Sequence, residues 1–533
     1  MKSQPNILLI TSDQQRADCN GFENPDIRTP HIDRLAREGT RFSACITPNL
    51  VCQPSRASIL TGQLPLTHGV WDNGVDLDPK VGERGYAGTL AKAGYDTAFL
   101  GKAHFSTKST FAPTGTPECN KSQDKYGPAW FGPYMGFQHV ELSVVGHMHR
   151  NRPLEDPPAG HYERWLVSRG ADGEALRLWA ESTRADNGAA QTWHSALPLA
   201  WHSSTWIGDR AVEWLKARPQ ARPFCAWVSF PDPHHPFDCP EPFSEMYDPK
   251  SVKLPKHRTR DLERRPWWHK ATLEGKPQLS DPVMLKFRAE GSRVPPQTDA
   301  QLAEMTANYY GMISLIDHNV GRIMTALDDL GIAENTLVVY TTDHGELLGN
   351  HGLYLKGPTP YEDLLRVTMV ARGPGVAANR VVKEPVSTLD LGATFLDIAG
   401  ATPEHEMQSR SLMPLLLPLQ GEGRDGGGSN DRRPGANPPP AQTRDCAWSE
   451  WHLHASRCGV PLKLRTVRTA KWKCTFELDS GAGELYDLVN DPAEMQNLYN
   501  DPGYASVQKE MHDLMRARPG KIRENLAEPI GMA

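Results

Sequence analysis

The stretch NLVCQPSRASILTG, residues 49–62, places one cysteine where a thiol can be chemically active. Pro54 suits the first position of a helix, because its missing N–H would have no partner there, and Gly62 can end the helix. Cys52 would then lie beside a helix N-terminus, where free N–H groups and the helix dipole lower the pKa of a thiol. The alternative is an inert buried thiol, the usual state of a free cysteine.

Two apolar runs, far apart in the chain, end in a similar way. NILLITSDQ (residues 6–14) and TLVVYTTDH (residues 336–344) are each typical of a strand buried in a parallel sheet. Ligands of such sheets collect at the carboxyl ends of the strands. We therefore expect the pairs Asp13-Gln14 and Asp343-His344 to contribute to one site. Taken singly, each Asp is equally well explained as a helix cap or a turn residue.

The elements that position these residues alternate along the chain. Residues 29–42 predict an amphipathic helix capped by Thr29, and residues 88–105 predict a helix, a stop at Gly94 and a strand. Residues 299–331 keep a helical period up to the TLVVYTTDH strand. This alternation favours an α/β fold with a mostly parallel sheet.

Composition shifts divide the chain into unequal parts. We expect a catalytic α/β domain over residues 1–418, with insertions at about 105–205 and 240–297. Residues 419–442 are rich in Gly, Pro and polar side chains, which predicts a linker or mobile loop. Residues 443–533 then form a smaller C-terminal α+β subdomain, because residues 462–477 alternate as antiparallel strands do.

Charge and cysteine content narrow the class of protein. A formal net charge of −6 is slight for 533 residues, so no nucleic-acid partner is expected. No apolar run is long enough to span a bilayer, and the N-terminal residues lack the long apolar segment of a signal peptide. The nine scattered cysteines fit a reduced compartment better than a disulfide framework. We therefore predict a cytoplasmic protein with no membrane partner.

Three motifs in this order resemble the sulfatase family of the alkaline phosphatase superfamily. CQPSRASILTG is similar to the family's Cys-x-Pro-Ser-Arg signature, and GYDTAFLGKAH to its second signature, which ends in Gly-Lys-x-His. ELYDLVNDPAEMQNL is typical of its C-terminal subdomain. The resemblance implies an alkaline-phosphatase-like sandwich, with a large mostly parallel sheet flanked by helices and a smaller C-terminal antiparallel sheet. It covers about residues 5–108, 223–237, 298–405 and 445–500.

In such enzymes a formylglycine-generating enzyme, a transient partner, converts the signature cysteine to the aldehyde formylglycine. The resemblance implies this fate for Cys52. One oxygen of the hydrated aldehyde attacks sulfur, and the second hydroxyl allows sulfate to leave without attack of water on sulfur. The expected reaction is hydrolysis of a small-molecule sulfate monoester, for which aryl sulfates are suitable assay substrates.

The resemblance also implies one divalent metal. Asp13, Gln14, Asp343 and His344 resemble the family's four protein ligands, and residue 52 lies in the same set. Three oxygen donors and one imidazole suit Ca²⁺ or Mn²⁺. Gln14 departs from the second Asp of many sulfatases and is shared with the related phosphonate monoester hydrolases.

The remaining site residues are positively charged, can transfer a proton or can contact the substrate. By resemblance, Arg56 bonds the formylglycine hydrate, Lys102 and Lys356 neutralise sulfate oxygens, and His104 acts as base on the second hydroxyl. His234 or the adjacent His235 donates to the leaving-group oxygen. Asn73 lies where relatives place a contact to the substrate or the hydrate.

Two other functions remain open at this stage. A phosphonate monoester or phosphodiester hydrolase would use the same machinery, and Gln14 favours it. The intact Pro-Ser-Arg and Lys102-Ala103-His104 favour the sulfatase, because those hydrolases typically depart from this pattern at the Ser and Lys positions. The third possibility is an anion-binding protein in which Cys52 is never modified. A homodimer or homotetramer is expected.

Overall fold

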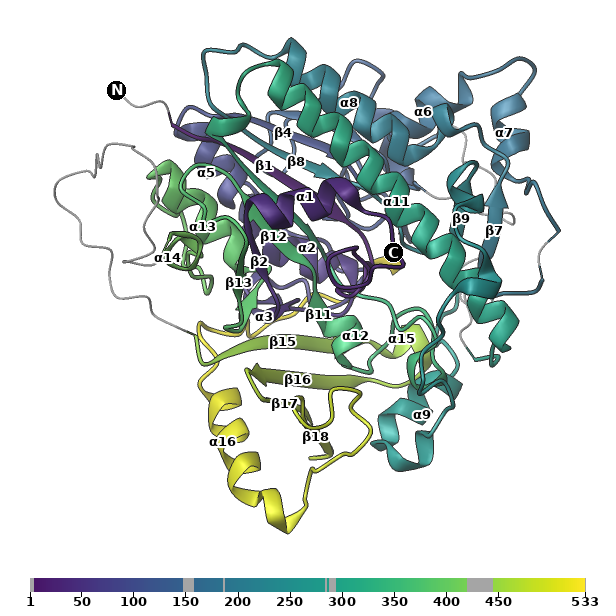
Figure 1. The fold of residues 1–533 in the computed structure, drawn as a ribbon, viewed down its shortest axis with the longest axis vertical. Coiled ribbons are helices and arrows are strands. Elements are labelled where there is room, and N and C mark those ends of the chain that lie inside the picture. Colours follow the sequence, from purple (N-terminus) through teal and green to yellow (C-terminus); the bar gives the residue numbers. More distant parts are fainter. Residues whose placement is uncertain are drawn as a thin grey trace.

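The computed structural model of the protein describes residues 4–146, 158–185, 187–282, 285–286, 294–418 and 444–532. The linker predicted at 419–442 lies outside these ranges. A central sheet of eight strands has the order β13-β2-β12-β10-β1-β8-β4-β6 (Figure 1). Its strands are β1 (Asn6–Ser12), β2 (Thr40–Phe42), β4 (Asp96–Gly101), β6 (His139–Leu142), β8 (Phe224–Ser229), β10 (Thr336–Thr342), β12 (Met369–Arg372) and β13 (Arg380–Val382).

The middle of this sheet is parallel, as the sequence predicts. β1 pairs in parallel with β10 on one side and β8 on the other, and β4 pairs in parallel with β8 and β6. Only β12 runs against its neighbours β10 and β2. The register places Ser12 beside Thr342, so the two Asp residues that follow leave the sheet at the same edge.

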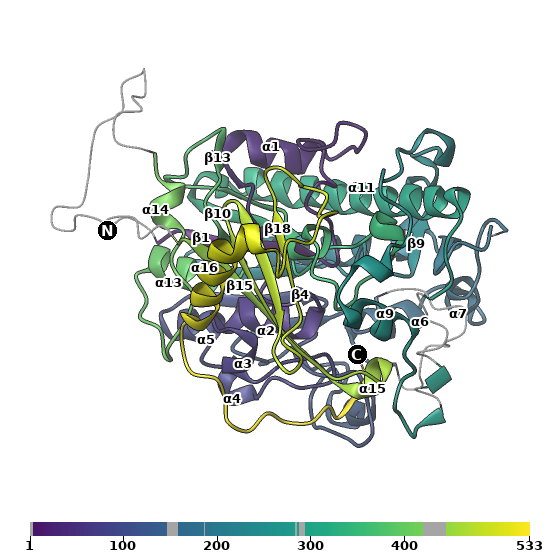
Figure 2. The same cartoon turned by 90° about the horizontal axis from the view of Figure 1, so that it is seen from below.

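Helices cover both faces of the sheet. Alternate residues of β1 point to opposite faces, so Leu8 and Ile10 belong to one core and Ile7 and Leu9 to the other. The first core is closed by α1 (Pro30–Glu38), α8 (Ser203–Ala217) and α11 (Asp299–Asp329), and the second by α2 (Cys52–Thr61), α5 (Tyr86–Lys92) and α13 (Asp390–Ala399). Figure 2 shows α1 and α11 on one side of the sheet and α2 and α5 on the other. This is the expected three-layer sandwich.

A second sheet lies below the first in Figure 1. It is antiparallel throughout and is formed by β15 (Cys446–Leu453), β16 (Leu462–Thr469), β17 (Trp472–Glu477) and β18 (Gly483–Asp487), with α16 (Ala505–Arg516) packed against it. The chain then returns to the main part, where β19 (Gly531–Met532) pairs with β5 (Ser109–Thr110). The domain limits at 418 and 443 stay predictions.

Shorter elements fill the connections between the two sheets and the helices. The helices are α3 (Pro65–His68), α4 (Pro79–Gly82), α6 (His161–Val167), α7 (Glu174–Trp179), α9 (Trp267–Glu274), α12 (Glu362–Leu365), α14 (Met413–Leu416) and α15 (Ala455–Cys458). The strands are β3 (Cys45–Ile46), β7 (Thr192–Ser195), β9 (Phe237–Pro240), β11 (Arg366–Val367) and β14 (Val386–Ser387). Within the described ranges, no helix combines the length and the apolar character needed to cross a bilayer.

Three local expectations need correction. The helix predicted over residues 29–42 ends at Glu38, because the backbone becomes extended at Gly39, and residues 40–42 form β2. α2 begins at Cys52 itself, so Pro54 is its third residue and not its first. Proline is tolerated there because the N–H groups of the whole first turn have no helical partner. Gly62 ends the helix in the left-handed conformation, as predicted, with φ 66°. Thr29 precedes α1, but its side chain does not cap the helix, because its hydroxyl donates to Asp33.

Candidate active site

Cys52 is the meeting point of three segments that are far apart in sequence. Its side chain is buried, with 1% of the residue exposed. The Sγ atom lies 3.0 Å from Lys356 Nζ, 3.1 Å from His344 Nε2 and 3.6 Å from Asp13 Oδ1. The helix start, the end of β1 and the loop after β10 therefore converge on one sulfur atom.

The charges around this sulfur favour its anionic form. Burial and the Asp13 carboxylate raise the pKa of the Cys52 thiol, but Lys356, Lys102 and His344 outweigh them, and the pKa lies well below its usual value. Because α2 begins at this residue, its N-terminal dipole acts in the same direction. The site is thus built to stabilise negative charge at the position of residue 52.

Arg56 ties the strand ends together. Its guanidinium is fully buried and donates to Asp343 Oδ2 at 2.9 Å and to Asp13 Oδ2 at 3.1 Å. It also donates to the Lys102 carbonyl at 2.7 Å and to the Ser229 hydroxyl at 2.8 Å. These four acceptors lie at the carboxyl ends of four neighbouring strands of the sheet, so Arg56 fixes their relative positions. The expected contact of Arg56 with a modified residue 52 stays a prediction.

Four buried side chains offer donor atoms for a metal ion. One ligand atom each from Asp13, Cys52, Asp343 and His344 lies within 4.8 Å of the others. Against burial, Lys102 and Arg56 hold the pKa of Asp13 well below its ordinary value, so this carboxylate is ionised. Lys102 Nζ lies 2.7 Å from Asp13 Oδ2. Two carboxylates and an imidazole fit a divalent cation such as Ca²⁺ or Mn²⁺.

Gln14 is held in a strained and specific conformation. Its φ of 64° lies in the left-handed region, which is uncommon for a side chain of this size. Its N–H donates to Asp343 Oδ1 at 3.1 Å. Its amide group contacts Glu346 and, at 3.1 to 3.2 Å, His235 Nδ1. The backbone thus places Gln14 at the donor cluster, while its role as a ligand stays a prediction.

The two adjacent histidines face different partners. His234 Nε2 lies 2.7 Å from Lys356 Nζ, the same ammonium group that contacts Cys52. His235 instead contacts Gln14. The imidazole rings are stacked, with centroids 4.1 Å apart. Geometry therefore favours His234 over His235 for a proton transfer near residue 52.

His104 and Asn73 also lie beside Cys52. The His104 ring interacts with the Cys52 side chain, and burial lowers the pKa of His104, which favours the neutral imidazole that a base requires. Asn73 Oδ1 accepts the N–H of Gln53 at 3.0 Å, so this side chain caps the start of α2. A direct substrate contact of Asn73 stays a prediction.

Sequence reasoning missed two carboxylates of this region, Glu118 and Glu346. Glu346 lies two residues after His344 and accepts from the Gln14 amide and from the Leu348 N–H at 3.0 Å. Glu118 accepts the backbone N–H of His104 at 2.5 Å. For Glu346 the signal was its closeness to the Asp-His pair. For Glu118, which lies in an aperiodic loop, the sequence held no signal.

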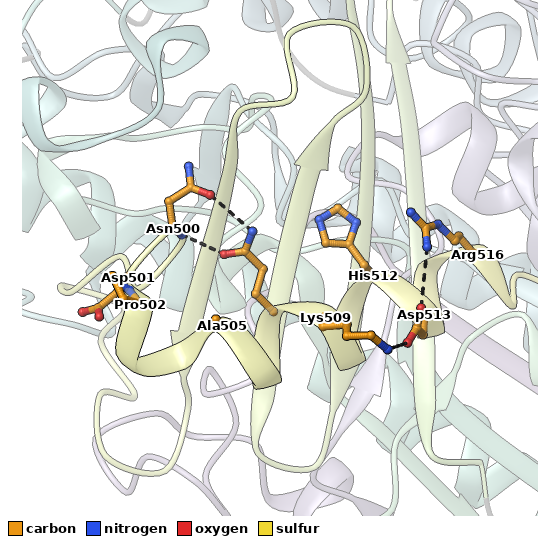
Figure 3. A pocket seen from close by; sticks show the side chains of 9 residues that line it. Asn500, Asp501, Pro502, Ala505, Lys509, His512, Asp513 and Arg516 are labelled. Carbon is orange, nitrogen blue, oxygen red and sulfur yellow. Dashed lines mark hydrogen bonds and ion pairs between the residues drawn. The ribbon is translucent and has the colours of Figure 1, made fainter.

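A separate hollow lies away from these residues, against α16 of the second sheet (Figure 3). Its volume is about 400 Å³, and none of the predicted site residues lines it. Lys509 and Arg516 both pair with Asp513 in its wall, so these charges are already satisfied. The chemistry argued from the sequence therefore belongs to the sheet edge at Cys52.

The fold and the donor cluster define a hydrolase of the alkaline phosphatase superfamily. The sulfatase family profile matches residues 5–401, and a profile described as the C-terminal part of N-sulphoglucosamine sulphohydrolase matches residues 437–520. The chain belongs to the sulfatase family, and its relatives include named sulfatases. This confirms the resemblance drawn from the three motifs and the predicted fold class.

Individual relatives span nearly the whole chain. An arylsulfatase of Clostridium perfringens is 27% identical over 96% of this chain and 93% of its own length. A choline-sulfatase of Rhizobium meliloti is 26% identical over 94% of this chain and 83% of its own. The crystal structure of a phosphonate monoester hydrolase from Agrobacterium radiobacter superimposes with a TM-score of 0.70 at 26% identity, covering 96% of this chain and 95% of that one.

Proposed function

We propose that the protein hydrolyses sulfate monoesters with a formylglycine made from Cys52 as nucleophile. The observation that carries this proposal is the environment of Cys52 Sγ, where two lysines, two histidines and a carboxylate surround a fully buried helix start. Formylglycine would supply a geminal diol, of which one oxygen attacks sulfur while the other remains to release sulfate. Family membership and the relatives named arylsulfatase and choline-sulfatase support this assignment.

One divalent cation is part of the proposal. Asp13, Gln14, Asp343 and His344 would hold it next to residue 52, and its chemistry would be to polarise a sulfate oxygen. Support comes from the donor atoms of Asp13, Asp343 and His344, which lie within 4.8 Å of one another and of Cys52, and from the lowered pKa of Asp13. Arg56 keeps both carboxylates in place through its two ion pairs.

The other side chains either stabilise developing charge or transfer protons. Lys102 and Lys356 stabilise the sulfate oxygens as charge develops during transfer. His234, with Lys356 at 2.7 Å, gives a proton to the leaving alcohol. His104 then takes the proton of the remaining hydroxyl, the carbon–oxygen bond to sulfate breaks, and the electron pair leaves with sulfate. The aldehyde is regenerated in this step.

The test is the mass of the peptide containing residue 52, from protein purified out of its native host. The expected result is loss of the thiol sulfur and gain of an aldehyde, together with hydrolysis of an aryl sulfate. Chelation should abolish turnover, and added Ca²⁺ or Mn²⁺ should restore it. An intact cysteine in every preparation would overturn the proposal and favour the anion-binding protein.

A phosphonate monoester or phosphodiester hydrolase is the second candidate. Gln14 favours it, and the phosphonate monoester hydrolase of known structure is as similar to this chain as the sulfatases are. Sulfate and phosphonate monoanions share charge and tetrahedral shape, so one site can accept both. The ratio of kcat/KM for an aryl sulfate and a phosphonate monoester of the same phenol decides which is the better substrate.

The proposal also covers the maturation of the protein, its compartment and its oligomeric state. A formylglycine-generating enzyme acts on the chain before α2 buries residue 52, and the mature protein works in the cytoplasm as a homodimer or homotetramer. All nine cysteines lie among the described residues, and none of them forms a disulfide there, which fits a reducing compartment. Light scattering and cell fractionation test these two statements.

A further inference from the structure

Glu118 forms an unusual anchor for the segment that carries His104. The residue is 4% exposed, and its carboxylate accepts three consecutive backbone N–H groups. The distances are 2.5 Å from His104 N, 3.0 Å from Phe105 N and 3.0 Å from Ser106 N. The Tyr134 hydroxyl donates to the same carboxylate at 2.8 Å. Glu118 lies between β5 and the short helix at Asn120–Lys125, in a loop that the sequence motifs do not cover.

The anchored segment has a conformation that needs such support. His104 has a φ of 53°, in the left-handed region. This conformation costs a residue with a side chain on the order of 1–2 kcal/mol, so it persists only where the surroundings impose it. A single carboxylate that takes the N–H groups of residues 104, 105 and 106 fixes the direction of the backbone at this point. The direction of the backbone in turn sets where the imidazole meets Cys52.

We propose that Glu118 is a positioning residue for His104 and, through it, for the release of sulfate from residue 52. The inference rests on the proposed function, in which His104 takes the proton of the second hydroxyl. When Glu118 no longer directs this backbone, the attack on sulfur still occurs but the second step slows. The expected signature is therefore accumulation of the sulfated enzyme, which a general loss of stability does not produce.

Asp317 provides a matched control at another place in the fold. It is a buried carboxylate on α11 that accepts the N–H of His31 at 3.0 Å and of Ile32 at 2.8 Å, and so holds the first turn of α1. The two residues are buried to a similar degree, with 4% of Glu118 and 2% of Asp317 exposed. Asp317→Asn should thus disturb the fold as Glu118→Gln does, without acting on His104.

The experiment follows release of phenol from an aryl sulfate on the pre-steady-state timescale. Four variants are compared with the parent protein, all with their formylglycine content and thermal midpoint measured: Glu118→Gln, Tyr134→Phe, His104→Ala and Asp317→Asn. Glu118→Gln should lower kcat by about 10- to 100-fold, the usual effect of removing a group that orients a functional side chain. KM should fall with it, and the first turnover should appear as a burst close to one phenol per modified site.

The expected loss of kcat in the other three variants can be compared with that in Glu118→Gln. His104→Ala should show the same burst with a larger loss of kcat, about 10²- to 10⁴-fold, as for removal of a general base. Tyr134→Phe removes one donor to Glu118 but leaves the three N–H groups, so its effect should have the same form and be smaller. It also keeps the inference testable if Glu118→Gln does not fold. Asp317→Asn should keep the kcat of the parent protein.

Two outcomes separate the inference from the proposed function. Equal kcat and no larger burst in Glu118→Gln and Tyr134→Phe than in Asp317→Asn would overturn the role of Glu118 alone. Failure of the fully modified, metal-loaded parent protein to release phenol would overturn the proposed function, and this inference with it. Trapping of the sulfated residue-52 peptide in Glu118→Gln by acid quench, confirmed by mass, is the result that supports the inference most directly.

Discussion

The protein buries two clusters of charged side chains that differ in how their charges are satisfied. The first, the site cluster, comprises Asp13, Cys52, Arg56, Lys102, Asp343, His344 and Lys356. The second, the junction cluster, joins the main part to the second sheet and comprises Asp261, Arg265, Glu362, Arg468, Lys473 and Glu494. Burial alone does not distinguish them, because each combines fully buried side chains with partly exposed ones.

In the junction cluster each cation meets an acceptor. Lys473 pairs with Glu494 and also donates to the Pro360 carbonyl. Arg468 pairs with Glu362 at 3.2 Å. Arg265 pairs with Asp261 at 2.6 Å and, like the lysine, bonds a backbone carbonyl. Such a network stabilises one arrangement of the chain and leaves no charge available for a ligand.

The site cluster contains a cation that has no carboxylate partner. Lys356 Nζ contacts the Cys52 thiol and the Nε2 atoms of His234 and His344, and it forms no ion pair with any carboxylate of the described residues. This partly buried ammonium is not balanced by a carboxylate, and an anionic substrate can supply that charge. Perturbed pKa values occur in both clusters and therefore do not distinguish them. The two clusters differ because Lys356 has no carboxylate acceptor.

The largest loss of turnover is expected for substitution of Cys52. Cys52→Ala should reduce turnover by more than about 10⁴-fold, as loss of a covalent nucleophile does in other hydrolases, while the free energy of unfolding stays close to that of the parent protein. The check is steady-state aryl sulfate hydrolysis together with urea unfolding. Cys45→Ala, in a buried strand outside the site cluster, is the control and should keep kcat. Residual turnover above one hundredth in Cys52→Ala would contradict the nucleophile assignment.

Part of the site cluster could be assembled from sequence, because Asp13 and Asp343 follow strands and Cys52 begins a helix. Arg56, Lys102 and Lys356 were placed there only by the resemblance to the family. NILLITSDQ and TLVVYTTDH each signal a buried strand, and the parallel register brings Asp13 and Asp343 together although they are 330 residues apart. The motif around Cys52 likewise marked its helix, apart from a shift of two residues at its start. A local pattern was sufficient to find these residues, because the parallel sheet brings the ends of distant strands together at one edge.

The parts that escaped prediction depend on contacts without a local pattern. Glu118 acts on a backbone segment 12 to 14 residues away through a loop with no periodicity. The pairing of Lys473 with Glu494 needs the final docking of the second sheet on the chain near Pro360. Alternation along residues 462–477 predicts strands, but which polar side chains those strands bury follows from the partner surface.

The junction cluster should respond in stability, where the site cluster responds in turnover. Lys473→Met leaves Glu494 buried without its counter-charge, which costs about 3–5 kcal/mol in the free energy of unfolding. Lys463→Met, on neighbouring β16, removes an exposed pair with Asp479 and should cost less than about 1 kcal/mol. Urea unfolding measures both. A tenfold loss of kcat in folded Lys473→Met would instead show that this cluster positions Lys356, four residues before Pro360.

A carboxylate beside the junction cluster should control stability in acid. Although burial opposes it, the His269 ring at 3.0 Å and the Tyr486 hydroxyl at 2.6 Å lower the pKa of Glu484 from 4.5 to about 2. The groups that also face it are Lys473, Tyr361 and Cys474. Because the folded-state pKa is depressed, the stabilisation is complete above pH 4.5 and is lost as pH falls toward 2.

Glu484→Gln removes this titration while keeping the shape of the side chain. The free energy of unfolding of the parent protein, relative to the variant, should rise by about 3 kcal/mol between pH 2 and pH 5. Urea unfolding at half-unit intervals of pH measures the difference. A difference independent of pH would show that Glu484 has the same pKa in the folded and unfolded chain.

The smallest effect expected is a change of preference at Lys102, and it bears on the substrate itself. Lys102 Nζ lies 2.7 Å from Asp13 Oδ2, so it is placed to share its charge between this carboxylate and an incoming anion. The family resemblance implies that phosphonate hydrolases depart from the sulfatase pattern at this position. Lys102→Thr should therefore lower kcat/KM for an aryl sulfate about tenfold more than for the matching phosphonate monoester, a difference of about 1.4 kcal/mol. Lys92→Thr, which removes an exposed lysine paired with Glu404, should change neither value. Equal losses on both substrates would mean that Lys102 serves the common anion site and that sulfate preference, if present, is set by the groups that contact the alcohol.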